Sequence, residues 1–219
     1  MDIQAIVESF PYYLQAMGTT LKLAFGGIFF SFLIGLLVGF IRYFRVPILK
    51  QLADGYTELS RNTPLLIQLF FIYYGLPKIG IQLSKELCGV IGLSFLGGGY
   101  MAESIRGGIE DVPLIQIESG KAIGLSRVQL ARYIIFPQGF LRSVSNIGAN
   151  ALFLLKETSV FSAIAIMDLT NVTRDLISMY YLTKEYMLML VISYVIILVP
   201  MGLFISYIER RVRYGVFGD

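Results

Sequence analysis

The chain has 219 residues, of which 56% are hydrophobic and only 15% are charged. Soluble domains are about 45–50% apolar and about 25% charged, so this composition indicates a membrane protein. The formal net charge is +3, and no polar domain carries a basic face, which argues against nucleic-acid binding. Histidine is absent, and so is the GxxxxGKS or GxxxxGKT pattern of nucleotide-binding loops. We therefore expect no catalytic site, no metal site, no cofactor and no ATP binding by the chain itself.

Five apolar segments are long enough to be transmembrane helices, since about 20 apolar residues cross a bilayer. We expect these helices at about residues 19–41, 56–76, 87–105, 144–167 and 187–207. Residues 1–18 are expected to lie along the outer surface as an amphipathic lead-in, and residues 209–219 to form a tail. The predicted fold class is all-α: a polytopic membrane protein with one transmembrane domain over residues 19–208.

Lysine and arginine are distributed unequally between the two sides of this arrangement. The connections over residues 42–62 and 106–142 carry four and five of them, and the tail carries three. The connections on the opposite side carry four in total, namely Lys78, Lys85, Arg174 and Lys184. Because basic residues accumulate on the cytoplasmic side, the C-terminus is predicted to be cytoplasmic. An odd number of spans then places the N-terminus outside.

A polar segment lies between apolar stretches at Glu118–Gln138, ESGKAIGLSRVQLARYIIFPQ. Its charges make a bilayer crossing costly, so it should lie on one side, within a cytoplasmic loop over residues 111–138. Gly124 can end one short helix, Ser126 can cap a second, and Pro137 should stop further helix. Apolar residues such as Ile123 and Val128 interrupt the polar pattern. They favour a docking element for a partner over a merely solvated loop.

Polar residues also interrupt the fourth apolar segment, at Lys156-Glu157-Thr158-Ser159. A charge at membrane depth costs at least about 2.5–3.5 kcal/mol, which usually marks function or pairing. A helix broken here would present backbone groups and a helix end to a polar ligand. The alternative is that Lys156 and Glu157 pair with each other or with neighbouring helices and only lock the packing.

Two further polar features of the predicted helices would concern a translocation path if the chain transports a ligand. Glu103 and Arg106 are three residues apart and share a helix face, which favours an ion pair near the cytoplasmic boundary. In the alternative, Glu103 faces the path and holds an ammonium group. Gln68 is the one strongly polar side chain in its apolar run and could also face the path. The glycines at 35, 39 and 97–99 indicate close helix packing, or a local break at 97–99.

The order of these motifs resembles the permease subunits of binding-protein-dependent ABC importers of the polar amino acid type. The segments that carry the resemblance are ELSRNTPLLIQLFFIYYGLP (Glu58–Pro77), YMAESIRGGI (Tyr100–Ile109), the polar segment Glu118–Gln138, LLKETSVFSAIAIMDL (Leu154–Leu169) and YIERR (Tyr207–Arg211). The polar segment is similar to the "EAA" loop on which the ATPase subunits of such importers dock. It reads Glu118-Ser119-Gly120 here, and Gly120 lowers helix stability by about 1 kcal/mol relative to alanine.

The resemblance implies a type I importer transmembrane domain in the plasma (inner) membrane of a prokaryote, working in ATP-driven amino acid import. It implies as partners ABC ATPase subunits, a second permease subunit, identical or paralogous, and an extracytoplasmic solute-binding protein. The implied ATPase-docking residues are Glu118, Ser119, Gly120, Ala122, Gly124, Leu125 and Pro137. The implied substrate-binding residues are Gln68, Glu103, Glu157, Thr158 and Ser159. An ATP-independent secondary amino acid transporter or channel is the alternative, and which amino acid is carried stays open.

Overall fold

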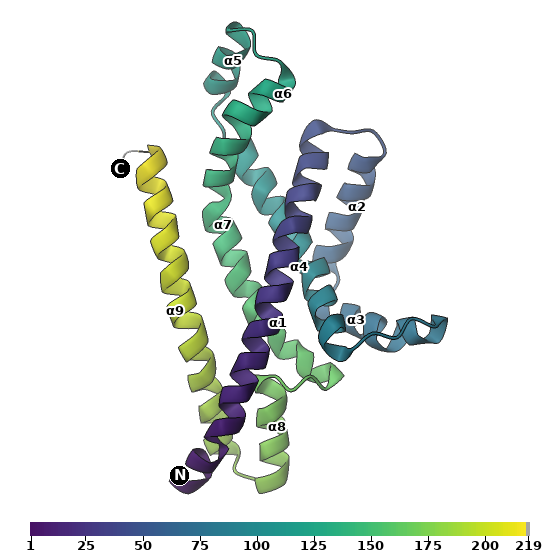
Figure 1. Ribbon diagram of the computed structural model, residues 1–219, viewed down its shortest axis with the longest axis vertical. Helices are drawn as coiled ribbons and strands as arrows, with labels where there is room; N and C mark the ends of the chain where they lie inside the picture. The colour runs from purple at the N-terminus through teal and green to yellow at the C-terminus, as the bar shows by residue number, and fades with distance from the viewer. Residues whose placement is uncertain (218–219) are drawn as a thin grey trace.

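The computed structural model describes the backbone of residues 1–217 and the side chains of residues 1–212, and all regular elements among them are helical. Four long helices run roughly along the longest axis (Figure 1). They are α1 (Ile3–Phe44), α4 (Lys85–Glu110), α7 (Phe136–Glu157) and α9 (Thr183–Phe217). The shorter helices α5 (Leu114–Ala122) and α6 (Arg127–Leu130) lie at one end of this bundle, and α8 (Leu169–Tyr180) lies at the other.

Helix α1 is continuous from its first turn, so the predicted lead-in over residues 1–18 is part of α1 and not a separate element. Asp2 caps the helix by accepting a hydrogen bond from the N–H of Ala5 at 3.1 Å. The buried hydroxyl of Tyr13 donates to the carbonyl oxygen of Tyr186 in α9 at 2.8 Å. This contact, between residues 173 positions apart, ties the first turns of α1 to α9, which the local sequence pattern could not predict.

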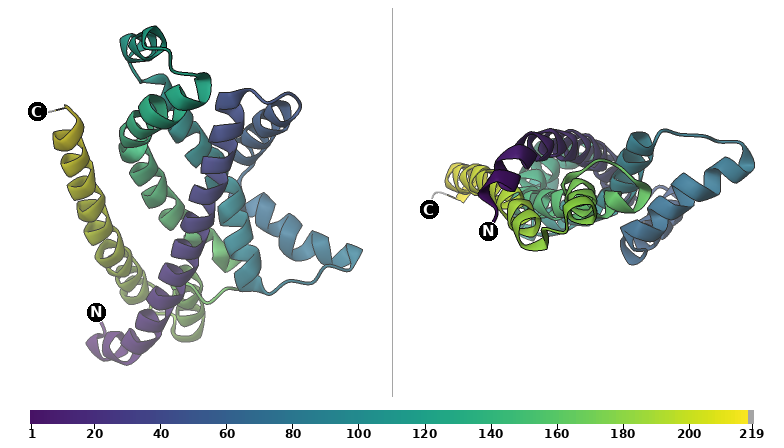
Figure 2. Two further views of the ribbon diagram at one scale, coloured as in Figure 1. Left: turned by 45° about the horizontal axis from the view of Figure 1, so that its top comes forward. Right: turned by 90° about the horizontal axis from the view of Figure 1, so that it is seen from below.

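The predicted second span, residues 56–76, is not one helix. It is divided between α2 (Leu49–Asn62) and α3 (Leu65–Phe70), which point in different directions (Figure 1). Figure 2 shows α3 and the segment after it projecting sideways from the long helices. The chain turns because Thr63 is extended before Pro64, where helical backbone angles are disfavoured. The continuous span expected from hydropathy alone is therefore wrong.

Two prolines lie directly after π turns, and in both cases the helix continues. The N–H of Leu76 donates to the carbonyl of Phe71 before Pro77, and the N–H of Phe136 donates to the carbonyl of Ala131 before Pro137. Proline has no N–H and clashes with the carbonyl four residues earlier. The wider π turn relieves this conflict. The prediction that Pro137 stops the helix is therefore wrong, and α6 (Arg127–Leu130), η3 (Ala131–Ile135) and α7 form one continuous helical rod.

The core lies where α1, α4 and α7 meet, and small residues allow these helices to approach closely. A Cβ on Gly35 of α1 would lie 2.4 Å from Cβ of Met101 in α4. The three glycines at 97–99 lie within the unbroken helix α4, and each faces a side chain of α1, α2 or α7. The packing interpretation of these glycines is confirmed, and the predicted alternative of a local break is wrong.

Among the described residues, three helical stretches are long and apolar enough on their own to cross a membrane: residues 3–44, 127–164 and 183–212. Residues 65–79 form a shorter apolar helix. The predicted third span, residues 87–105, lies within the 26-residue helix α4. The five-span arrangement and its orientation stay predictions.

Candidate functional site

A hairpin of short helices projects from one end of the bundle (Figure 1). It consists of α5 (Leu114–Ala122), a turn at Gly124, and α6 with η3. Gly124 has a φ of +82°, its N–H donates to the carbonyl of Lys121, and the next N–H, of Leu125, donates to that of Gly120. This hydrogen-bonding pattern ends α5 in a Schellman motif. Ser126 and Gln129 form a capping box that starts α6, so the predicted N-cap is confirmed.

Gly120 is buried inside the hairpin. A Cβ at this position would lie 2.5 Å from Cδ2 of Leu130 and 2.6 Å from Cδ1 of Ile134. The absence of a side chain therefore lets α5 pack directly against α6 and η3. The expected loss of helix propensity at Gly120 is offset by this close packing, which fixes the angle at which the hairpin projects.

The predicted docking residues do not all lie on the surface of the hairpin. Glu118, Ser119, Ala122 and Gly124 are exposed, whereas Leu125 is half-buried beneath the turn. Pro137 is exposed but belongs to the first turn of α7, beyond the hairpin.

The most exposed apolar side chains of the hairpin are Leu114, Ile115, Ile123 and Val128, with exposed fractions between 65% and 78%. Large apolar groups so exposed on a polar element mark a surface that a partner covers. Leu114 and Ile115 were missed because they precede the polar segment on which the sequence interpretation concentrated. The run of apolar residues directly after Pro113 was the available signal.

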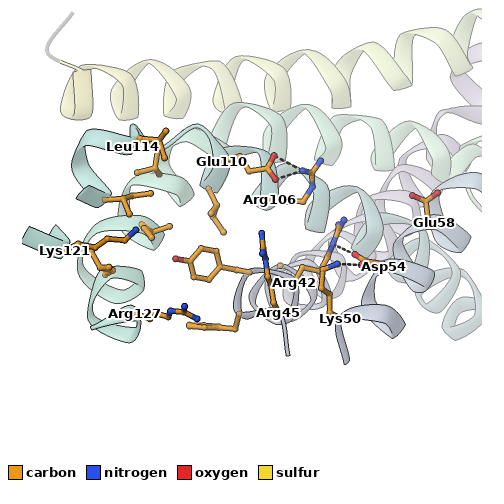
Figure 3. Close-up of a pocket in the computed structure, with 18 residues that line it drawn as sticks. Arg42, Arg45, Lys50, Asp54, Glu58, Arg106, Glu110, Leu114, Lys121 and Arg127 are labelled. Atoms are coloured by element: carbon orange, nitrogen blue, oxygen red, sulfur yellow. Dashed lines mark hydrogen bonds and ion pairs between the residues drawn. The ribbon is translucent and has the colours of Figure 1, made fainter. Parts of the chain in front are cut away.

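Glu103 belongs to a network of ion pairs that joins three helices. Its carboxylate accepts hydrogen bonds from Arg42 of α1 and, at 2.8 and 2.9 Å, from Arg106 one turn further along α4. Arg42 also contacts Asp54 of α2 at 2.7 Å, and Arg106 contacts Glu110 at 2.6 Å (Figure 3). The predicted Glu103–Arg106 pair is confirmed, whereas Arg42 was missed because it lies 61 positions away.

Replacing Glu103 by glutamine is expected to lower the free energy of unfolding by about 2 kcal/mol, because it removes one of the two carboxylates that the partly buried Arg42 contacts, the other being Asp54. Arg42→Gln should cost a similar amount. The double variant should lose much less than the sum of the two single losses, since they share one interaction. Denaturation of the wild type, the two single variants and the double variant in detergent micelles measures the unfolding free energies of this double-mutant cycle. Strict additivity, together with a raised KM for substrate in Glu103→Gln, would instead support a substrate-binding role for Glu103.

The remaining predicted substrate residues lie where two interrupted helices meet: one breaks between α2 and α3, and the other where α7 ends. These residues are Gln68, Glu157, Thr158 and Ser159. α3 packs against η4 (Thr158–Ile164), the 3-10 turn into which α7 passes, and the fully buried Leu69 and Phe161 share one core cluster there. Gln68 of α3 donates to the carbonyls of Ser60 and Thr63, both at 3.0 Å, which satisfies groups left free by the break before Pro64.

Several polar groups at this junction retain unused capacity to bind a ligand. The buried Oε1 of Gln68 has no hydrogen-bond partner among the described residues. Glu157 is half-buried at the end of α7, and no salt bridge joins its carboxylate to a described residue. Thr158 is fully buried and its hydroxyl donates to the carbonyl of Leu155 at 2.7 Å. The structure thus brings Gln68 near the segment of Thr158 and Ser159, but places Glu103 elsewhere, at the end of the bundle that carries the hairpin.

Long apolar helices with a polar hairpin projecting from one end define a helical membrane protein. The family described as binding-protein-dependent transport system inner membrane component matches residues 10–214, so the chain belongs to that family.

Its relatives include amino acid permeases. The nopaline transport system permease protein NocM of Agrobacterium fabrum is 37% identical over 195 residues, covering 84% of this chain and 81% of the relative. The glutamine transport system permease protein GlnP of Escherichia coli is 29% identical over 214 residues, covering 97% and 98%. The predicted resemblance to ABC importer permeases of the amino acid type is therefore confirmed.

Two solved structures have the same fold. A crystal structure of an amino acid ABC transporter with histidines matches with a TM-score of 0.90 and 30% identity, covering 96% of this chain and 99% of that chain. An inward-facing structure of the MetNI methionine ABC transporter matches with a TM-score of 0.79 at 20% identity, covering 94% and 98%. These neighbours give the all-helical type I importer fold.

Proposed function

We propose that the chain is the transmembrane subunit of an ATP-driven amino acid importer in the inner membrane of a prokaryote. The observation that carries the proposal is a rigidly capped hairpin, exposed and apolar at its tip, on a chain of the importer permease family. In this proposal separate ATPase subunits bind the hairpin from the cytoplasmic side. A second permease subunit completes the path, and a solute-binding protein delivers substrate from outside.

The five predicted spans give this proposal its orientation. With the N-terminus outside and the C-terminus inside, the hairpin lies on the cytoplasmic side, as its basic residues favour. The rod formed by α6, η3 and α7 then runs from the ATPase contact to the junction at Glu157. At about 1.5 Å per residue it spans roughly 45 Å. A rigid rod of this length can carry a displacement of the hairpin to the polar groups at membrane depth.

We propose the broken-helix junction as the site that contacts the amino acid. An amino acid carries an ammonium and a carboxylate, which need a carboxylate and hydrogen-bond donors respectively. Among the described residues, Glu157 has no salt-bridge partner for its carboxylate and Gln68 has no hydrogen-bond partner for its acceptor oxygen. Ser159 and the end of α7 add polar groups of the kind that transporters use at interrupted helices. Glu103 is the weaker candidate, because arginines engage both of its oxygens.

Glu157→Gln is expected to reduce amino acid uptake by about tenfold or more, because the amide cannot pair with the ammonium group. ATPase association should be unchanged, since Glu157 lies at the far end of the rod from the hairpin. Uptake into proteoliposomes and co-purification with the ATPase measure the two effects. Lys156→Gln is the control, because the neighbouring side chain is exposed. Normal uptake in Glu157→Gln would remove this residue from the site.

The proposed function itself is tested by reconstitution with the ATPase and the binding protein. Uptake should require internal ATP and should persist without an ion gradient. Uptake that follows an ion gradient and survives ATP depletion would instead support the secondary transporter or channel.

A further inference from the structure

A charged cavity of about 840 Å³ opens between the hairpin and the adjoining ends of α1, α2 and α4 (Figure 3). Six cationic side chains line it: Arg42, Arg45, Lys50, Arg106, Lys121 and Arg127. Three acidic side chains also line it, so cations exceed acids by three. The wall includes apolar and aromatic groups as well, among them Tyr43, Phe44 and Ile135. The cavity therefore combines a net positive charge with apolar surface.

The three excess cations, Arg45, Lys121 and Arg127, form no salt bridge with an acidic side chain among the described residues. Arg42 and Lys50 share Asp54, and Arg106 pairs with Glu110. The hydrogen bond from Lys50 holds the pKa of the Asp54 carboxyl below its usual range, so that this acid stays ionised and neutralises its neighbours. The third acid that lines the cavity, Glu58, accepts a hydrogen bond from Asn62 at 3.0 Å.

Arg45, Lys121 and Arg127 come from three different elements: the end of α1, α5 and the start of α6. No salt bridge joins any of them to another described residue, although all three face one cavity (Figure 3). Positive charges held together across a cavity repel each other, and an anion between them would remove that cost.

An exposed apolar ridge on α1 leads to this cavity. Leu33, Leu37, Phe40 and Phe44 recur at helical spacing, with exposed fractions between 39% and 62%. Phe44, at the end of the ridge, is itself part of the cavity lining. A ligand that satisfies both features has an anionic head and an apolar chain, which is the chemistry of a phospholipid.

We propose that the cavity binds the phosphate-containing headgroup of an anionic phospholipid, with an acyl chain lying along the ridge of α1. The proposal rests on the proposed function in one respect, the cytoplasmic orientation of the hairpin. That orientation places the cavity at the inner leaflet. Basic pockets between transmembrane helices on this side are suited to anionic headgroups, at about 1 kcal/mol per basic side chain. The lipid would link the hairpin to α1 and α2 and so steady the element that meets the ATPase.

The test compares lipid retention by the purified full chain in neutral detergent. Native mass spectrometry counts bound phosphatidylglycerol and phosphatidylcholine with the same acyl chains. The wild-type chain should retain phosphatidylglycerol in preference. The triple variant Arg45→Gln, Lys121→Gln, Arg127→Gln should lose that preference by about 100-fold, since each cation contributes about fivefold. The matched control is Arg132→Gln, Arg210→Gln, Arg211→Gln, which removes three exposed arginines outside the cavity and should behave as wild type.

Three outcomes would overturn the proposal. The first is an unchanged phosphatidylglycerol preference in the triple variant. The second is complete displacement of the lipid by millimolar inorganic phosphate, which would show a site for free phosphate. The third is unchanged lipid retention combined with lost ATPase binding, which would show that an acidic group of the ATPase occupies the cavity. If the triple variant does not fold, the three single variants replace it, each expected to lose about fivefold.

Lipid retention is measured on this chain alone, so the two proposals fail separately. Lost lipid preference with intact ATP-driven uptake would overturn only the lipid site. Intact lipid preference without ATP-driven uptake would overturn only the proposed function.

Discussion

Ile123→Asp is expected to separate the permease from its ATPase without unfolding it. The Ile123 side chain is 78% exposed at the tip of the hairpin, so the substitution removes almost no packing within the chain. In the docked complex the same side chain would be buried against the ATPase, where a carboxylate lacks a partner. Loss of a central interface anchor costs at least about 2 kcal/mol, which corresponds to about thirtyfold weaker binding. Co-purification and ATP-driven uptake should both fall to background.

The control for this experiment is Ile79→Asp. Ile79 is 73% exposed and lies in η2 (Leu76–Ile79), outside the hairpin, so it tests the effect of an added surface charge alone. It should retain ATPase binding. Equal association of wild type and Ile123→Asp would exclude the tip of the hairpin as the docking surface.

Gly108→Ala is expected to be the most destabilising small substitution in the bundle, at about 3 kcal/mol. A Cβ at Gly108 of α4 would lie 2.3 Å from the carbonyl oxygen of Gly139 and 2.8 Å from the backbone nitrogen of Ser143, both in α7. Backbone atoms cannot rotate away, so α4 and α7 would have to separate. Because α7 is part of the rod from the hairpin, the same change should also weaken coupling.

The neighbouring glycine supplies a matched control. Gly107 lies in the same helix, and no packing neighbour among the described residues lies within 4 Å of a Cβ built there. Gly107→Ala should therefore stabilise the helix by up to about 1 kcal/mol. Denaturation of both variants in mixed micelles measures the difference. Equal stabilities of the two alanine variants would contradict the close approach of α4 and α7.

The turn of the hairpin could be predicted from the sequence because it depends on local interactions. Gly124 and Ser126 act within a few residues of themselves, through a left-handed backbone angle and a capping box, so neighbouring residues suffice to predict them. One of the two interpretations of the polar residues at 156–159, an interrupted helix, agrees with the end of α7 at Glu157. The π turn before Pro137 could not be predicted from the sequence, since a proline inside a helix favours a stop unless surrounding packing holds the helix together.

The substrate candidates show a different limit of sequence reasoning. The sequence leaves Glu103 open as a substrate ligand or as an ion-pair partner, and only the structure places Arg42 of α1 beside it. Gln68 was predicted from its polarity alone, but its amide caps the end of α2, which follows from the turn at Pro64. Its role as a cap leaves only Oε1 for a ligand.

The sequence by itself determined the membrane character of the chain, its family, and the turn at the centre of the hairpin. Hydropathy, motif order and helix capping depend on residues close together in the chain, so they can be read without a fold. Only the tertiary structure decided that Gly120 is a packing contact, that α3 leaves the direction of α2, and that three cations without a salt bridge to a described residue face one cavity. Each of these depends on contacts between distant segments, which form only when the helices pack.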